Sequence, residues 1–193
     1  MAPPTGTHAL GPENATLTVR TGKTGAAAKA GHNLRIEVTS WSATLDLGDD
    51  PSASLTADAR SLRVREGHGG MQSLDDDDKA NIDKTVDEEV LKGTAIAFHC
   101  SSVQVHGDRL TLAGELELGG RRGPLTFELS VGGDGSLTGT AVVKQSDWGM
   151  KPYSTLFGTL KVVDEVEVAI EGTLGSSAST LQPGLAKGSG RNG

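Results

Sequence analysis

The stretch that decides the fold reads SDWGMKPYSTLFGTLKVVDEVEVAI and covers residues 146–170. It begins with a Trp-Gly and Pro-Tyr corner and ends in an alternation of Val166, Val168 and Ile170 with glutamates. Successive side chains of a strand point to opposite faces, so this alternation is typical of a half-buried strand. The corner holds three of the chain's six aromatic residues. We therefore predict a strand that follows a loop, and this loop is a candidate binding mouth.

Composition narrows the class of protein. The chain has 193 residues, 35% of them hydrophobic, and its 27 glycines favour an all-β domain with many tight turns. A net charge of -7 argues against a nucleic-acid partner, which would require a basic face. The only cysteine, Cys100, excludes an intramolecular disulfide and a multi-cysteine metal site.

The period of two continues through most of the chain. Apolar residues alternate over 34–38, 110–118 and 125–129, and turns rich in Gly, Asp and Pro separate such runs at 48–51 and 119–124. The pattern predicts roughly eight or nine strands joined mostly by hairpins, and so an antiparallel sheet. Closure of this sheet into a barrel would remove exposed strand edges.

One segment, residues 73–91, breaks this period. Leu74, Ile82, Val86 and Val90 recur at multiples of four, which places them on one stripe of a helix. Ser73 and Asp76 have the spacing of a capping box, and Gly93 is a candidate C-terminal stop. We predict one helix that packs on the barrel or caps one end of it.

The two ends of the chain lack periodicity. Residues 1–12 are rich in proline and residues 174–193 in serine and glycine, so we predict disordered flanks around a single domain at 13–173. No apolar run approaches the length of a membrane span, and no secretory signal precedes the domain. These features predict a cytoplasmic protein without an integral membrane segment.

The order of these parts resembles that of the YceI-like family. The helix is followed by AIAFHCSSV at 95–103, and a hairpin run over 110–125 is similar to the family's pattern of Gly and Leu. Residues 146–150, SDWGM, are similar to its Arg-x-Phe-Gly-Met segment, and residues 164–168 to its closing strand. The resemblance covers residues 14–172, nearly the whole predicted domain.

This resemblance implies an eight-stranded, lipocalin-like antiparallel barrel that binds a polyisoprenoid or another long apolar lipid. Such a site needs an inward apolar face and a few polar groups for the head of the ligand. The expected ligand-binding residues are Leu34, Ile36, Trp41, Phe98, His99, Phe127, Val143, Trp148, Tyr153 and Phe157. The last three lie near the mouth, and His99 contacts the head group if it shares a face with Ala95 and Ala97.

The residues also leave alternatives open. The same apolar side chains fill a solid barrel equally well, which would leave a stress-related or interaction protein that works through its surface. An enzyme would use His99 or His32 as acid and base in the pocket. No Gly-x-Ser-x-Gly elbow or zinc-ligand spacing is present, so we expect no catalytic residue, no metal and no cofactor. Barrels of this kind often pair, and a homodimer is among the expected partners.

Overall fold

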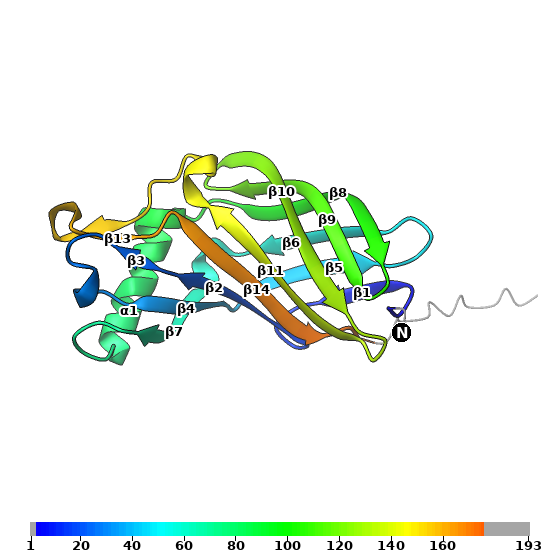
Figure 1. Cartoon of the computed structure of the whole chain (residues 1–193), viewed down its shortest axis with the longest axis horizontal. Coiled ribbons are helices and arrows are strands. Elements are labelled where there is room, and N and C mark those ends of the chain that lie inside the picture. Colours follow the sequence, from blue (N-terminus) through cyan, green and yellow to red (C-terminus); the bar gives the residue numbers. More distant parts are fainter. Residues whose placement is uncertain (1–2, 176–193) are drawn as a thin grey trace, which may run out of the picture.

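The computed structural model describes residues 3–175, and an antiparallel sheet dominates them. Eleven strands hydrogen-bond in the order β1-β5-β6-β8-β9-β10-β11-β14-β2-β4-β7 and curl around a common interior (Figure 1). Their bounds are β1 (Thr7–Leu10), β2 (Ala15–Thr21), β4 (Asn33–Val38), β5 (Trp41–Asp46), β6 (Ser52–Ala57), β7 (Leu62–His68), β8 (Ile96–His106), β9 (Arg109–Leu118), β10 (Arg121–Val131), β11 (Ser136–Lys144) and β14 (Glu165–Thr173).

Local sequence explains the hairpins. In β10 the half-buried Leu125 and Phe127 alternate with exposed residues, so one face of the strand meets the interior and the other meets water. Gly119 and Gly120 connect β9 to β10 with φ angles of 58° and 78°. A two-residue hairpin turn of this kind requires positive φ at both positions, which glycine adopts without a steric cost.

The prediction of an all-β antiparallel sheet that curls into a barrel-like fold with one helix is confirmed, but within residues 3–175 the curled sheet has eleven strands rather than the predicted eight. Within residues 3–175 the strands β1 and β7 are the two ends of the sheet, and each pairs with one neighbour. Two short connections lead from β4 to β5 at 39–40 and from β6 to β7 at 58–61. They are joined by hydrogen bonds from Thr39 N to Ser61 O (2.9 Å) and from Asp58 N to Ser40 O (3.0 Å).

The N-terminal segment is part of this sheet, which corrects the predicted flank at 1–12. Strand β1 pairs with β5 over Thr7–Leu10, and His8 is buried with its Nδ1 2.9 Å from Gly175 O. At the other end, Leu174 of the predicted tail 174–193 is buried and its N–H donates to Gly135 O. Residues 176–193 of that tail lie outside the described residues.

The predicted helix is present with a different start. Helix α1 (Asp76–Thr85) continues into the π-helical turn η3 (Val86–Leu91) and crosses one end of the sheet (Figure 1). Its capping box pairs Asp75 with Asp78, two residues beyond the predicted pair, and places three aspartates in the positive first turn. Lys92 and Gly93, both with positive φ, end it.

A second, three-stranded sheet lies at the same end as α1 (Figure 1). It has the order β12-β13-β3, with β3 (Lys23–Thr24), β12 (Ser154–Thr155) and β13 (Leu160–Val162). Four short 3-10 turns complete the described chain: η1 (Ala28–Ala30), η2 (Ala59–Ser61), η4 (Gln145–Trp148) and η5 (Leu156–Gly158). The small sheet was too short to produce a periodic signal in the sequence.

Candidate functional site: an apolar cavity in the curled sheet

The interior of the curled sheet contains a cavity of about 580 Å³. The inward residues of the strands and one side of the helical segment line it, because strand alternation and the four-residue helical stripe point these side chains to the same space. Ligand pockets in proteins typically measure about 300–1,000 Å³. The volume is therefore that of a binding cavity rather than of a packing defect.

Aliphatic and aromatic side chains make up most of this lining. The rings of Phe98 and Phe127 meet edge to face, with centroids 5.2 Å apart and planes at 61°. Apolar liners include Leu17, Val19, Leu34, Ile36, Leu55, Ile82, Val86, Val90, Ile96, Leu116, Leu125, Val143, Met150, Leu160, Val166, Val168 and Ile170. Such a surface favours a ligand that is mostly hydrocarbon.

Hydroxyl-bearing liners such as Thr44, Ser54 and Thr140 lie on the large sheet, whereas the larger polar liners lie near the small sheet and α1. These larger liners include Lys23, His32, Asn81, Tyr153 and Lys161. Lys23 Nζ donates to Gly31 O at 2.5 Å, and His32 Nε2 lies 2.7 Å from Gln72 O. The cavity therefore has one end that carries cationic and phenolic groups beside a lining that is otherwise mostly apolar.

The aromatic corner divides into an inner and an outer part. Trp148 is only 4% exposed, and its Nε1 donates to Leu116 O at 2.8 Å, which fixes the ring in a second core cluster with Phe98, Leu116 and Val143. Tyr153 lines the cavity, whereas Phe157 is fully exposed at the tip of η5. The corner thus seals the core at Trp148 and lines the cavity at Tyr153.

Ser146 and Asp164 hold the base of this corner. The Ser146 hydroxyl donates to Asp164 Oδ2 at 2.5 Å, and its N–H donates to Asp164 Oδ1 at 2.8 Å. The hydroxyl hydrogen bond lowers the pKa of the Asp164 carboxyl below its ordinary value. The two residues join the end of β11 to the start of β14 and do not line the cavity.

Of the ten predicted ligand-binding residues, six line the cavity: Leu34, Ile36, Phe98, Phe127, Val143 and Tyr153. Trp41 and Trp148 are buried in the core beside it, and Phe157 faces solvent. The inward position considered for His99 is corrected, because its neighbour Phe98 faces the cavity and alternation turns His99 outward.

The sequence interpretation missed the helical wall and the valines of β14. Ile82, Val86 and Val90 were predicted to form one helical stripe, and Val166, Val168 and Ile170 to form one strand face. All of them line the cavity. The signal was present, but periodicity identifies a buried face without showing whether that face meets another side chain or an open space.

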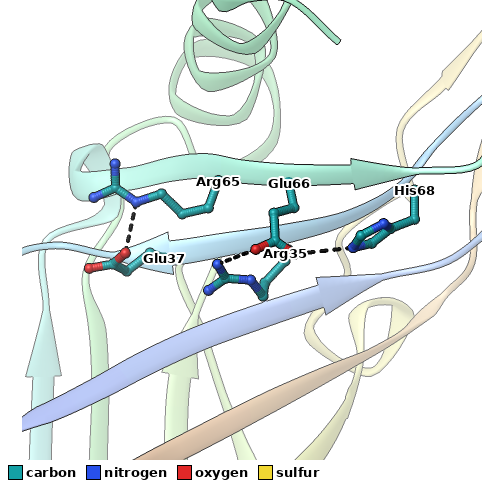
Figure 2. Close-up of polar contacts among 5 residues, drawn as sticks. All are labelled: Arg35, Glu37, Arg65, Glu66 and His68. Atoms are coloured by element: carbon teal, nitrogen blue, oxygen red, sulfur yellow. Dashed lines mark hydrogen bonds and ion pairs between the residues drawn. The ribbon is translucent and has the colours of Figure 1, made fainter. Parts of the chain in front are cut away.

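Charged pairs occupy the outer face of the sheet where β4 meets β7, as Figure 2 shows. Arg35 Nη2 lies 2.7 Å from Glu66 Oε1, Arg65 Nε lies 2.7 Å from Glu37 Oε2, and His68 adds a contact of 3.1 Å to Glu66. The hydrogen bond from Arg35 lowers the pKa of Glu66, and the same bond raises the pKa of Arg35. These partly exposed pairs hold an end strand in place and lie away from the cavity.

Residues 3–175 offer neither a metal-binding cluster nor a helix that could span a membrane. No cluster of three or more His, Cys, Asp or Glu residues has a geometry for holding a metal ion in this part of the chain. No helix in the same residues is long and apolar enough to cross a bilayer.

The sequence matches the model of the YceI-like domain over residues 10–174. The chain belongs to the YceI-like family. This match includes the strands from β2 to β14, the helix and the aromatic corner, so the predicted resemblance is confirmed. A search of curated proteins finds no match.

Several solved structures share the fold. BcnA of Burkholderia cenocepacia superposes with a TM-score of 0.58 at 16% identity, covering 81% of this chain and 94% of BcnA. A mutant YceI protein of Campylobacter jejuni gives a TM-score of 0.54 at 14% identity and covers 74% of this chain and 85% of its own. At these identities the likeness concerns the fold alone.

Proposed function

We propose that this YceI-like protein binds and carries a long apolar lipid, of isoprenoid type, inside the curled sheet without chemical change. The observation that carries this proposal is the cavity of about 580 Å³ with its apolar lining. Burial of a hydrocarbon chain there would contribute roughly 25 cal/mol for each Å² removed from water. The polar liners at one end supply a place for the head group.

The filled-barrel alternative has less support. A protein that worked only through its surface would need no interior space, and a volume above about 300 Å³ is large for a packed core. An enzyme would have to rely on His32, since His99 faces outward. His32 Nε2 is already in contact with a backbone carbonyl, which fits a structural histidine. We still predict that the protein is cytoplasmic. A role in stress and a homodimer also stay predictions.

Binding can be tested with the fluorophore phenylnaphthylamine and two matched variants. Ala141 lines the cavity, while the next residue, Val142, is 59% exposed on the opposite face of β11. We expect Ala141→Phe to fill the cavity and weaken binding of the fluorophore at least about tenfold, and Val142→Phe to bind like the wild type. Mass spectrometry of lipids extracted from protein purified from its own host would identify the ligand.

Two results would contradict the proposal that the protein carries a lipid in its cavity. One is wild-type protein that is free of lipid and does not bind the fluorophore. The other is equal binding of the fluorophore by the wild type and by Ala141→Phe, because the fluorophore would then lie outside the cavity. Circular dichroism shows whether Ala141→Phe and Val142→Phe are folded.

A further inference from the structure

The chain around the polar end of the cavity forms one hydrogen-bonded unit. We call residues 21–32 and 149–163 the mouth loops. Strand β3 of the first pairs with β13 of the second, Ala27 N donates to Thr159 O at 2.8 Å, and Val163 N donates to Gly22 O at 3.0 Å. Figure 1 shows this unit extending beyond the large sheet at the end that α1 crosses. Both mouth loops contribute cavity-lining residues.

The charge of the mouth loops is opposite to that of the whole protein. They contain Lys23, Lys29, Lys151 and Lys161 and no aspartate or glutamate, in a chain with 25 acidic residues and a net charge of -7. Lys29, Lys151 and Lys161 are exposed. Asp164 follows directly, but its carboxylate accepts both hydrogen bonds from Ser146 at the base of the corner. The mouth loops are therefore a positive region on an acidic protein.

The tip of the second mouth loop is apolar. Leu156 is 51% exposed and Phe157 is fully exposed, and both adopt left-handed backbone, with φ angles of 51° and 56°. Residues other than glycine rarely adopt this backbone conformation. Backbone strain of this kind is concentrated at functional sites. Two large apolar side chains are thus held in water beside exposed lysines and the cavity.

From this juxtaposition we infer that the mouth loops bind the surface of an anionic lipid bilayer, with Leu156 and Phe157 inserted into the interface. Apolar side chains combined with lysines are the features by which proteins attach to such surfaces. The contact would bring this end of the cavity to the source of its lipid. The inference rests on the proposed function for that purpose, but the binding itself is measured separately.

A lipid surface fits these residues better than a protein partner does. Specific protein interfaces bury about 800 Å² on each partner, which far exceeds what two side chains on one tip supply. The four aspartates Asp75–Asp78 begin α1 at the same end of the sheet. Their negative charge would turn that side of the mouth away from anionic lipid and leave the mouth loops to make the contact.

Flotation with vesicles of phosphatidylcholine, with and without phosphatidylglycerol, tests this inference on the full chain. We expect wild-type protein to float with the anionic vesicles and to be released by high salt. The double variant Leu156→Ser, Phe157→Ser should reduce the bound fraction at least about fivefold, because the inserted apolar area is lost. Lys29→Glu with Lys151→Glu should remove the preference for phosphatidylglycerol.

The matched control is Val142→Ser, which removes an exposed apolar side chain from the outer face of β11. It should float like the wild type. The inference is overturned if wild type does not float with anionic vesicles, or if Val142→Ser lowers flotation as much as the double variant. It is also overturned if the double variant converts a dimer into a monomer in sedimentation, since the tip would then be a protein contact.

The experiments distinguish failure of the membrane-binding inference from failure of the lipid-carrier proposal. Wild-type protein that binds phenylnaphthylamine but not vesicles keeps the cavity function and loses the membrane contact. Wild-type protein that floats but binds no fluorophore keeps the membrane contact and loses the proposed carrier function.

Discussion

The two tryptophans are buried to a similar extent but have different polar contacts. Trp148 Nε1 donates to Leu116 O at 2.8 Å, whereas Trp41 Nε1 is buried without a hydrogen-bond partner among the described residues. A buried polar group without a partner destabilises the folded state by about 1–3 kcal/mol. The indole of Trp41 therefore stabilises the core through its apolar surface alone.

This contrast gives a matched pair of substitutions. Trp41→Phe and Trp148→Phe remove similar ring volume, but the first removes an unpartnered buried N–H whereas the second removes a hydrogen bond. We expect Trp148→Phe to lower the free energy of unfolding by about 2 kcal/mol more than Trp41→Phe does. Urea unfolding followed by circular dichroism measures the difference. Equal losses would show that ring volume, not the Nε1 contact, determines the effect.

For single residues, the sequence predicted which kinds of side chain form the interior better than which individual side chains point into it. Phe98 and His99 are adjacent, and both were expected inside, yet a strand can place only one of them there. Trp148 and Phe157 share a corner, and one is buried while the other is exposed. Which face of a strand points inward, and which path a loop takes, depend on pairing with distant segments. Local composition does not encode this pairing.

Among the elements, strand β7 shows how a helix protects the end of a sheet. Asp83 of α1 accepts a hydrogen bond from Val64 N at 2.7 Å, so a side chain satisfies a backbone donor that has no strand beside it. Unpaired strand edges are sites for unwanted association, and natural proteins cover them. The helix therefore both lines the cavity and covers the edge of β7.

We expect Asp83→Ala to lower the free energy of unfolding by about 1–2 kcal/mol, because a hydrogen bond to a charged acceptor is lost. Asp87→Ala is the control on the same helix, since Asp87 makes only a 3.7 Å contact with the exposed Arg60. Such surface pairs contribute about 0–1 kcal/mol. Denaturant unfolding of both variants distinguishes them, and an effect of Asp87→Ala as large as that of Asp83→Ala would refute the role of Asp83.

The sequence predicted the helix and the long strands better than it predicted the total number of strands. The helix and the long hairpins have strong periods and were predicted from them, whereas β3, β12 and β13 are two or three residues long and carry no periodic signal. The strand count and the ends of the sheet depend on the connections at 39–40 and 58–61. These long-range choices cannot be deduced from the alternation of single strands.

For the whole molecule, several carboxylates link stability to pH. Asp46, Glu66, Asp134 and Asp164 each have a pKa below the ordinary value, and in every case a side-chain hydrogen bond is the largest cause. The donors are Thr7, Arg35, Ser136 and Ser146 respectively. The folded protein therefore binds fewer protons than the unfolded chain in acid.

The sign of the pH dependence follows from these lowered pKa values. The stabilisation is fully present above the unfolded pKa values, about 3.9 for Asp and 4.3 for Glu, and it is lost as the pH falls through the lower folded values. We expect the free energy of unfolding to decrease on acidification below about pH 4. Unfolding of wild type and Asp164→Asn across this range tests it. Their difference should shrink as the pH falls, and a difference that grows would contradict the linkage.

The path of the chain between the two ends of the sheet has a mechanical consequence. The connection 39–40 makes β4 and β5 successive parts of one run of chain, and the connection 58–61 does the same for β6 and β7. Thr39 N donates to Ser61 O and Asp58 N donates to Ser40 O, so backbone hydrogen bonds continue the pairing of β4 with β7 into that of β5 with β6. The wall cannot part at this place without breaking the chain or these bonds, so we expect a container of fixed girth whose cargo enters at an end and not between strands.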